Sequence, residues 1–166
     1  MDVLHFIKSY HDEVRTVLAA MAANDGIKVR RAKLDDCAGL VQTYLDLERA
    51  YLYPETQDLF PGAETLCRVG EANGVAISRR MKALQKLAGK AATEQDGYDK
   101  RLAELKEAVL AHFDAEEQLL MPKMRLLIRT EDREDLGQVF VDAREELRSG
   151  TPAEGVSPGV STRKRA

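Results

Sequence analysis

Apolar residues recur at every third or fourth position along four long stretches of the chain, residues 2–21, 33–53, 63–87 and 96–128. This spacing places them on one face of an α-helix. A shorter helix is expected over residues 130–148, where Thr130 can cap the start and the acidic Glu131 and Asp132 suit the helix dipole. No stretch alternates apolar and polar residues as a half-buried strand does. The pattern predicts an all-α protein, an up-down-up-down antiparallel four-helix bundle with a short fifth C-terminal helix.

Prolines and glycines mark special points on these helices. Pro54 is predicted to end the second helix, because proline disfavours α geometry in the residue before it. Pro122 is predicted to kink the fourth, because it removes a backbone hydrogen bond. Gly70 and Gly74 lie inside the third helix, where each glycine costs about 1 kcal/mol relative to alanine. We therefore expect another group to approach the third helix closely at these glycines.

The length of 166 residues fits one domain with a sizeable core. After residue 148 the composition changes to Gly, Pro, Ser and Thr, which is typical of disorder. We therefore divide the chain into a helical bundle over residues 1–148 and a flexible, disordered tail over residues 149–166. Cys37 and Cys67 are too far apart in sequence to indicate a disulfide framework or a thiolate zinc site.

The charge and hydropathy of the chain bear on its partners. The formal net charge of −3 gives no reason to expect a nucleic-acid partner. No stretch reaches the roughly 20 apolar residues of a membrane span, and the N-terminus lacks the pattern of a signal peptide. A soluble, cytoplasmic protein that does not contact a membrane is the expectation.

The candidate chemistry centres on the segment AHFDAEEQLLMPKM, residues 111–124. His112 and Glu116 are four residues apart, so an imidazole and a carboxylate share one helix face and can chelate a cation. The apolar residues around them indicate that this face points inward. His11 lies on the apolar face of the first helix in the same way. Such buried groups need a metal ion, a hydrogen-bonded network or partial exposure to offset their desolvation.

The second and fourth helices echo one another at an offset of 68 residues. Tyr44 then aligns with His112, Glu48 with Glu116, and Pro54 with Pro122. This correspondence predicts that two facing helices contribute two halves of one site.

At this point the chain resembles the hemerythrin-like (HHE cation-binding) family, four-helix bundles that hold a pair of non-haem irons. The resemblance covers about residues 2–148. It rests on Asp2-Val3-Leu4 and His11-Asp12-Glu13-Val14-Arg15 in the first helix, on Glu48 and Tyr53-Pro54 in the second, and on His112 to Glu117 with Pro122 in the fourth. It implies ligands at His11, position 44, Glu48, position 74, His112 and Glu116. Two expected histidines are replaced, by Tyr44 and Gly74.

The resulting hypothesis is a non-haem metal-binding protein whose metal ligands are His11, Tyr44, Glu48, His112 and Glu116. Iron follows from the resemblance, as one or two ions, while the donor set also suits manganese or zinc. A small ligand such as peroxide, dioxygen or nitric oxide would bind beside Gly74. No further acid or base is placed for catalysis, so the pattern does not decide whether the protein is an enzyme.

Two alternatives remain open at this level. The first is a metal-free bundle that serves as an interaction, structural or small-molecule-sensing module. The second concerns Tyr44, which is either a phenolate ligand to the metal or a side chain that fills the space left at Gly74.

Overall fold

The computed structural model describes residues 1–21, 25–88 and 95–149, and within these ranges it contains helices and no strand. This confirms the predicted all-α class. The elements are α1 (Val3–Ala20), α2 (Ile27–Leu47), η1 (Glu48–Leu52), α3 (Tyr53–Thr56), α4 (Ala63–Ala88), α5 (Gln95–Ala115), η3 (Glu116–Leu120), α6 (Met121–Leu127) and α7 (Thr130–Ser149). The predicted tail lies outside the described residues from position 150 onward.

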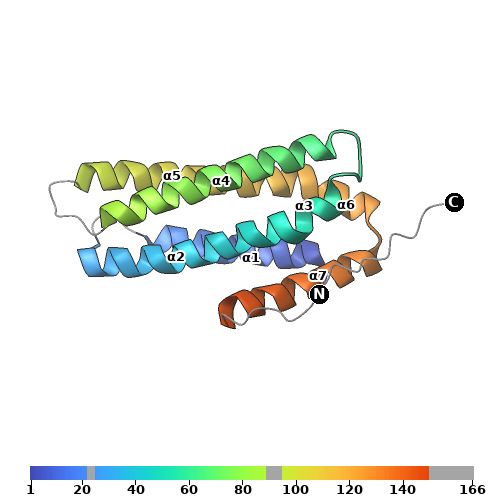
Figure 1. The fold of residues 1–166 in the computed structure, drawn as a ribbon, viewed down its shortest axis with the longest axis horizontal. Coiled ribbons are helices and arrows are strands. Elements are labelled where there is room, and N and C mark those ends of the chain that lie inside the picture. The colour runs from blue at the N-terminus through green and yellow to red at the C-terminus, as the bar shows by residue number, and fades with distance from the viewer. Residues whose placement is uncertain (22–24, 89–94, 150–166) are drawn as a thin grey trace.

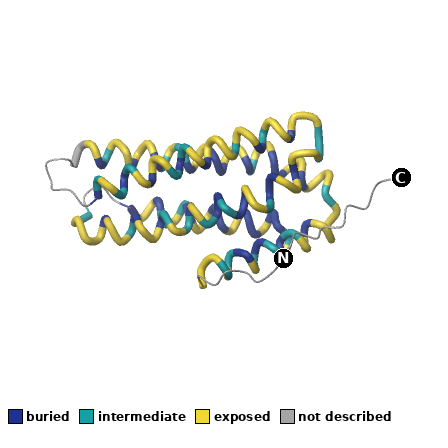
Figure 2. Tube along the Cα trace, viewed as in Figure 1, coloured by how far each residue is buried: buried dark blue, intermediate teal, exposed yellow. Residues whose placement is uncertain are grey.

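The four long helices α1, α2, α4 and α5 lie alongside one another as an up-down-up-down bundle (Figure 1). Their inward faces are buried along the length of the bundle, while the outward faces are exposed (Figure 2). The fifth helix, α7, packs outside the bundle against α1 and α2. None of the described helices combines the length and the apolar character needed to cross a membrane.

Asp2 joins the start of α1 to α7. Its Oδ1 atom accepts a hydrogen bond from the backbone N–H of Leu4 at 2.8 Å, which caps α1. Its Oδ2 atom accepts one from Nε of Arg133 at 2.9 Å. A Cβ atom at Gly137 would overlap the carbonyl oxygen of Met1, so glycine allows α7 to lie directly on the N-terminus.

The first of the two prolines acts differently from expectation. The helix does not end at Pro54, because α3 carries this proline in its first turn and continues to Thr56. Each proline instead follows a π-helical turn, η1 or η3. The N–H of the residue before each proline donates to the carbonyl five residues back, Tyr53 to Glu48 and Met121 to Glu116. Because proline offers no N–H and its ring crowds the preceding turn, a widened turn lets the helix continue.

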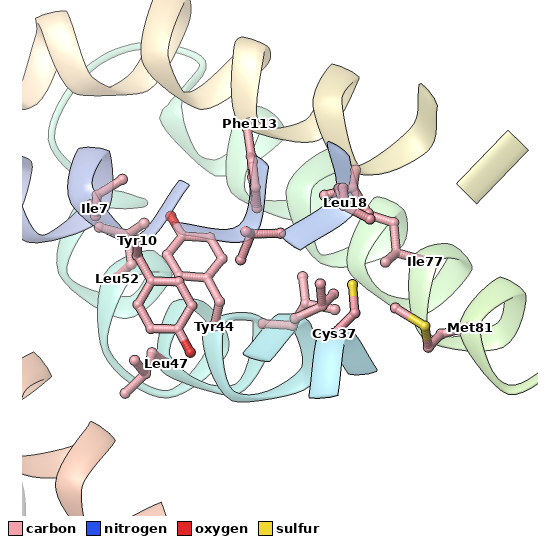
Figure 3. Close-up of a cluster of buried hydrophobic side chains, with 14 of the residues drawn as sticks. Ile7, Tyr10, Leu18, Cys37, Tyr44, Leu47, Leu52, Ile77, Met81 and Phe113 are labelled. Atoms are coloured by element: carbon pink, nitrogen blue, oxygen red, sulfur yellow. The ribbon is translucent and has the colours of Figure 1, made fainter. Parts of the chain in front are cut away.

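Aromatic rings fill the middle of the core beside these turns. Tyr10 from α1 and Tyr44 from α2 lie side by side, with ring centroids 5.2 Å apart, and Phe113 points toward them from α5 (Figure 3). The Phe113 and Tyr44 rings meet edge to face at 5.5 Å. Tight packing of this kind fixes the direction of the Tyr44 phenol.

Candidate metal centre

The structure brings the five predicted ligand residues together in the middle of the bundle. They come from different elements, and each is at most 5% exposed. They are His11 from α1, Tyr44 from α2, Glu48 from η1, His112 from α5 and Glu116 from η3. The second and fourth helices of the sequence echo therefore contribute side chains that meet in the core. Tyr44 contacts Glu116, and Glu48 contacts His112.

Glu48, His112 and Glu116 form a group of buried side chains that could hold a metal ion. One donor atom from each lies within 4.8 Å of the others. Nε2 of His112 is 2.9 and 3.1 Å from the two carboxylate oxygens of Glu48. Glu48 and Glu116 are the first residues of the two π turns. Such turns occur often at functional sites, and here each begins at a carboxylate whose oxygen lies within 4.8 Å of a ligand atom of the other and of His112.

Glu116 also belongs to a second group, with His11 and Tyr44. The Tyr44 hydroxyl donates to Oε2 of Glu116 at 2.7 Å and lies 2.8 Å from Nε2 of His11. Nε2 of His11 is 3.3 Å from the same Glu116 oxygen. One nitrogen and two oxygens thus surround a single point, and Glu116 links it to the group formed with Glu48 and His112.

Glu117 orients His11 from outside the cluster. Its Oε1 atom lies 2.8 Å from Nδ1 of His11 and also accepts a hydrogen bond from Arg15 at 2.8 Å. An imidazole nitrogen that faces a carboxylate carries the proton. The contact therefore fixes the imidazole so that Nε2 points to Tyr44 and Glu116. Sequence reasoning did not select Glu117 or Arg15, although each sits within one helical turn of a predicted ligand.

Tyr53 is a third residue that sequence reasoning did not select for the site. It was expected to pack at a helix end, yet its hydroxyl donates to Oε1 of Glu116 at 3.3 Å. Gly70 explains how the phenol reaches this position, because a Cβ atom there would overlap the Tyr53 hydroxyl. The expected close approach at Gly70 is confirmed, and the approaching group is a phenol.

Gly74 is approached by Leu45. A Cβ atom at Gly74 would lie 3.2 Å from Cδ2 of Leu45, and no Tyr44 atom is among its near neighbours. The interpretation of Tyr44 as the side chain that fills this space is therefore wrong. Leu45 occupies it, while the Tyr44 hydroxyl reaches the polar cluster instead.

Burial and mutual repulsion decide where protons reside in the cluster. Burial, together with the nearby Glu116 charge, raises the pKa of Glu48 to about 8. Burial opposes a charge on His112, but the Glu48 carboxylate outweighs it and raises the pKa of His112 to about 9. Burial would also raise the pKa of Glu116, yet the hydrogen bond from His11 and the charge of His112 lower it to about 2. At neutral pH protons therefore occupy the space between these donor atoms.

Burial also affects the two phenols that contact Glu116. Burial, with the neighbouring glutamates, raises the pKa of Tyr44 well above its ordinary value, and it raises the pKa of Tyr53 likewise. Both tyrosines are therefore neutral in the metal-free protein. A phenolate at Tyr44 requires a nearby cation that displaces its proton.

The donor set fits a metal ion of the iron, manganese or zinc type. Imidazole nitrogen and carboxylate oxygen are ligands that these ions accept. A buried pair of carboxylates is costly unless cations or protons offset it. The hydrogen bonds among these side chains already satisfy them, because no side-chain atom of the cluster is among the unpartnered buried atoms of the described residues. An ion must therefore replace protons rather than fill a void.

A comparison with protein families finds a match over most of the chain. The model of the hemerythrin HHE cation-binding domain matches residues 2–124. The matched range holds the whole cluster and ends before α7. Neither the curated proteins nor the solved structures include a significant match.

Proposed function

Since the chain belongs to the hemerythrin HHE cation-binding domain family, we propose that it binds a non-haem iron ion in the bundle core. The ligands in this proposal are His112, Glu48 and Glu116. His11 and Tyr44, together with the shared Glu116, would bind a second ion or complete a larger coordination sphere around the same ion.

The observation that carries the proposal is the convergence of three buried donor atoms from separate helical elements within 4.8 Å. Burying two carboxylates next to each other works against stability. A bound cation offsets that cost, and the family match adds a reason to expect one. Manganese and zinc are the competing ions, because the same donor types bind them.

Iron held in this way would supply redox and ligand-exchange chemistry with small molecules such as peroxide, dioxygen or nitric oxide. The chain's own residues have more limited tasks. Glu117 and Arg15 orient His11, Phe113 packs on the His11 ring with centroids 3.9 Å apart, and the apolar core keeps bulk water away.

A metal-free module is the second candidate, and one observation favours it. The cluster is fully hydrogen-bonded without an ion, with Tyr44 between His11 and Glu116. In this case the network would stabilise a particular bundle geometry, and the function would reside on the surface or in a cavity.

Metal analysis separates the two candidates. We expect protein purified without chelators, or reconstituted with ferrous iron under anaerobic conditions and then oxidised, to hold about one to two irons per chain. A tyrosinate absorption band in the visible spectrum, absent from Tyr44→Phe, would support Tyr44 as a ligand.

His112→Ala is expected to lose the iron, whereas the exposed His5 offers a matched control in His5→Ala. Folded wild-type protein that takes up no iron, manganese or zinc contradicts the proposal. Equal iron content in His112→Ala and wild type contradicts the assigned ligands.

A further inference from the structure

The Tyr53 phenol reaches the metal centre from the side that faces α4. Its hydroxyl donates to Oε1 of Glu116 at 3.3 Å, whereas the Tyr44 hydroxyl donates to Oε2 of the same carboxylate at 2.7 Å. Glu48 acts on the Tyr53 phenol both by its charge and as a hydrogen-bond partner. Tyr53 therefore borders both carboxylates of the metal-binding group, while Tyr44 also contacts His11, outside that group.

Gly70 of α4 makes room for the polar end of Tyr53. A Cβ atom at Gly70 would overlap the Tyr53 hydroxyl and the ring carbon that carries it. A glycine in a helix interior destabilises the helix relative to alanine. The chain thus has a less stable turn of α4 at the point where the Tyr53 hydroxyl meets the carboxylates.

One π turn directs both Glu48 and Tyr53 into the centre. Glu48 is the first residue of η1, and the backbone N–H of Tyr53 donates to the Glu48 carbonyl. At 3.6 residues per turn, residues five apart lie on different faces of an α-helix. A π turn closes its hydrogen bond over five residues and brings them to one face. A carboxylate and a phenol from one helix therefore point to the same place.

The three metal-binding side chains leave the α4 side of the centre without a donor of their own. Glu48, His112 and Glu116 come from η1, α5 and η3. A four-coordinate ion held by three side chains has one position left to fill. The Tyr53 hydroxyl lies on the open side, directly over Gly70.

The charge of the enlarged donor set matches a trivalent ion. Two carboxylates and one phenolate carry three negative charges, and uncompensated charge is costly in a buried site. A ferric ion neutralises all three charges, whereas zinc or another divalent ion leaves one. Phenolate oxygen is also an established ligand of iron in proteins.

From this arrangement we propose that Tyr53 is the fourth protein ligand of the ion bound by Glu48, His112 and Glu116, and that its phenolate favours ferric iron. This inference rests on the proposed function. Ligation breaks the O–H bond of Tyr53 and forms a bond from the phenolate oxygen to the ion, with no transfer of electrons. The proton passes to solvent through a pocket of about 410 Å³ between α2 and α4, which Tyr53 and Glu48 both line.

The test is the visible tyrosinate band of the full-length protein loaded with one ferric ion per chain, compared per bound iron. Because Tyr44 can give the same band, Tyr44→Phe is the background, and we expect it to retain a tyrosinate band. Adding Tyr53→Phe should remove the band. Adding Tyr51→Phe should leave it, because the Tyr51 ring packs against Phe140.

Two glycines give a second, matched pair of variants that keep every phenol. Gly70→Ala should weaken or shift the band, because the added Cβ displaces the Tyr53 hydroxyl. Gly39→Ala should leave the band unchanged, because a Cβ atom there meets nothing within 4 Å. Circular dichroism confirms that the variants fold.

The results separate this inference from the proposed function. Bound iron with no band in Tyr44→Phe, or with a full band after Tyr53→Phe is added, overturns the assignment of Tyr53 and retains the metal centre. An unchanged band in Gly70→Ala likewise contradicts ligation by Tyr53. Wild-type protein that takes up no iron removes both proposals.

Discussion

The contact between His112 and Glu48 is the residue-scale feature on which the metal centre depends. Nε2 of His112 lies 2.9 Å from Glu48, so a proton occupies the place where an ion would bind. On the other side of Glu116, the Tyr44 hydroxyl donates its proton to Oε2 of Glu116, so an ion that binds there also takes the place of a proton. Metal binding at this centre is therefore an exchange of protons for a cation.

This exchange predicts how ion affinity depends on pH. The Glu48 carboxylate raises the pKa of His112, and burial raises the pKa of Glu48, so this contacting pair holds one or more protons at neutral pH. Since an ion must displace them, affinity should rise between pH 6 and pH 9, by up to about tenfold per pH unit for each proton displaced. Zinc titrations in weak buffer with a pH indicator measure the released protons directly.

Release of at least one proton per zinc at pH 7 is expected. An affinity that stays constant from pH 6 to pH 9, with no proton released, would show that the ion does not bind among these groups.

Glu117 provides a second prediction at the residue scale. It holds Nδ1 of His11 at 2.8 Å, and the loss of such an outer carboxylate commonly lowers metal affinity about 10- to 100-fold. Glu117→Ala should show a loss of this size for the ion that uses His11, measured by competition with a chromophoric chelator.

Asp114→Ala is the control for that variant. Asp114 is 58% exposed and contacts Arg15 at 3.2 Å, but it does not contact His11. Equal losses in the two variants would mean that surface charge, and not the orientation of His11, determines affinity.

At the scale of elements, the metal centre depends on two π turns and on the glycines of α4. Glu48 and Glu116 are the first residues of the two π turns. Gly70 leaves room for the Tyr53 phenol, and Gly74 leaves room for the Leu45 side chain. Two helices are thus modified to bring carboxylates inward, while a third contributes only space.

Alanine substitution tests the role of Gly70. In α2, a Cβ atom at Gly39 would meet nothing within 4 Å, so Gly39→Ala should raise the free energy of unfolding by up to about 1 kcal/mol through helix propensity. Gly70→Ala should lower it by about 1 to 2 kcal/mol, because overlap with Tyr53 outweighs that gain. Urea denaturation of both variants makes the comparison, and stabilisation by Gly70→Ala would contradict the described packing.

At the scale of the whole molecule, the sequence predicted the helices well and the distortions poorly. Helix boundaries follow in part from apolar periodicity, which is a local signal. The predicted fifth helix agrees with α7 to within one residue, whereas α2 begins at Ile27 and not at the predicted residue 33. The prediction that Pro54 ends the second helix was wrong, because a π turn lets the helix continue to Thr56. Whether a proline ends a helix or widens a turn depends on what packs around it, so the π turns could not be read from the chain.

Apolar periodicity also made part of the metal-binding cluster predictable from the sequence. His11, His112 and Glu116 are polar residues on apolar helix faces, a pattern that indicates inward-facing groups. Tyr53 and Leu45 look like ordinary core residues in the sequence. Their roles depend on the two α4 glycines lying opposite them, which only the packed bundle reveals.

The most direct test of the metal centre is anomalous diffraction from crystals of the protein grown with zinc at a pH near 9. The proposed metal centre should give an anomalous peak about 2.0–2.2 Å from Nε2 of His112 and from carboxylate oxygens of Glu48 and Glu116. The bond between His112 and Glu48 would then be replaced by bonds to the ion. An intact bond between these two side chains, with no anomalous peak between the three residues, would contradict it.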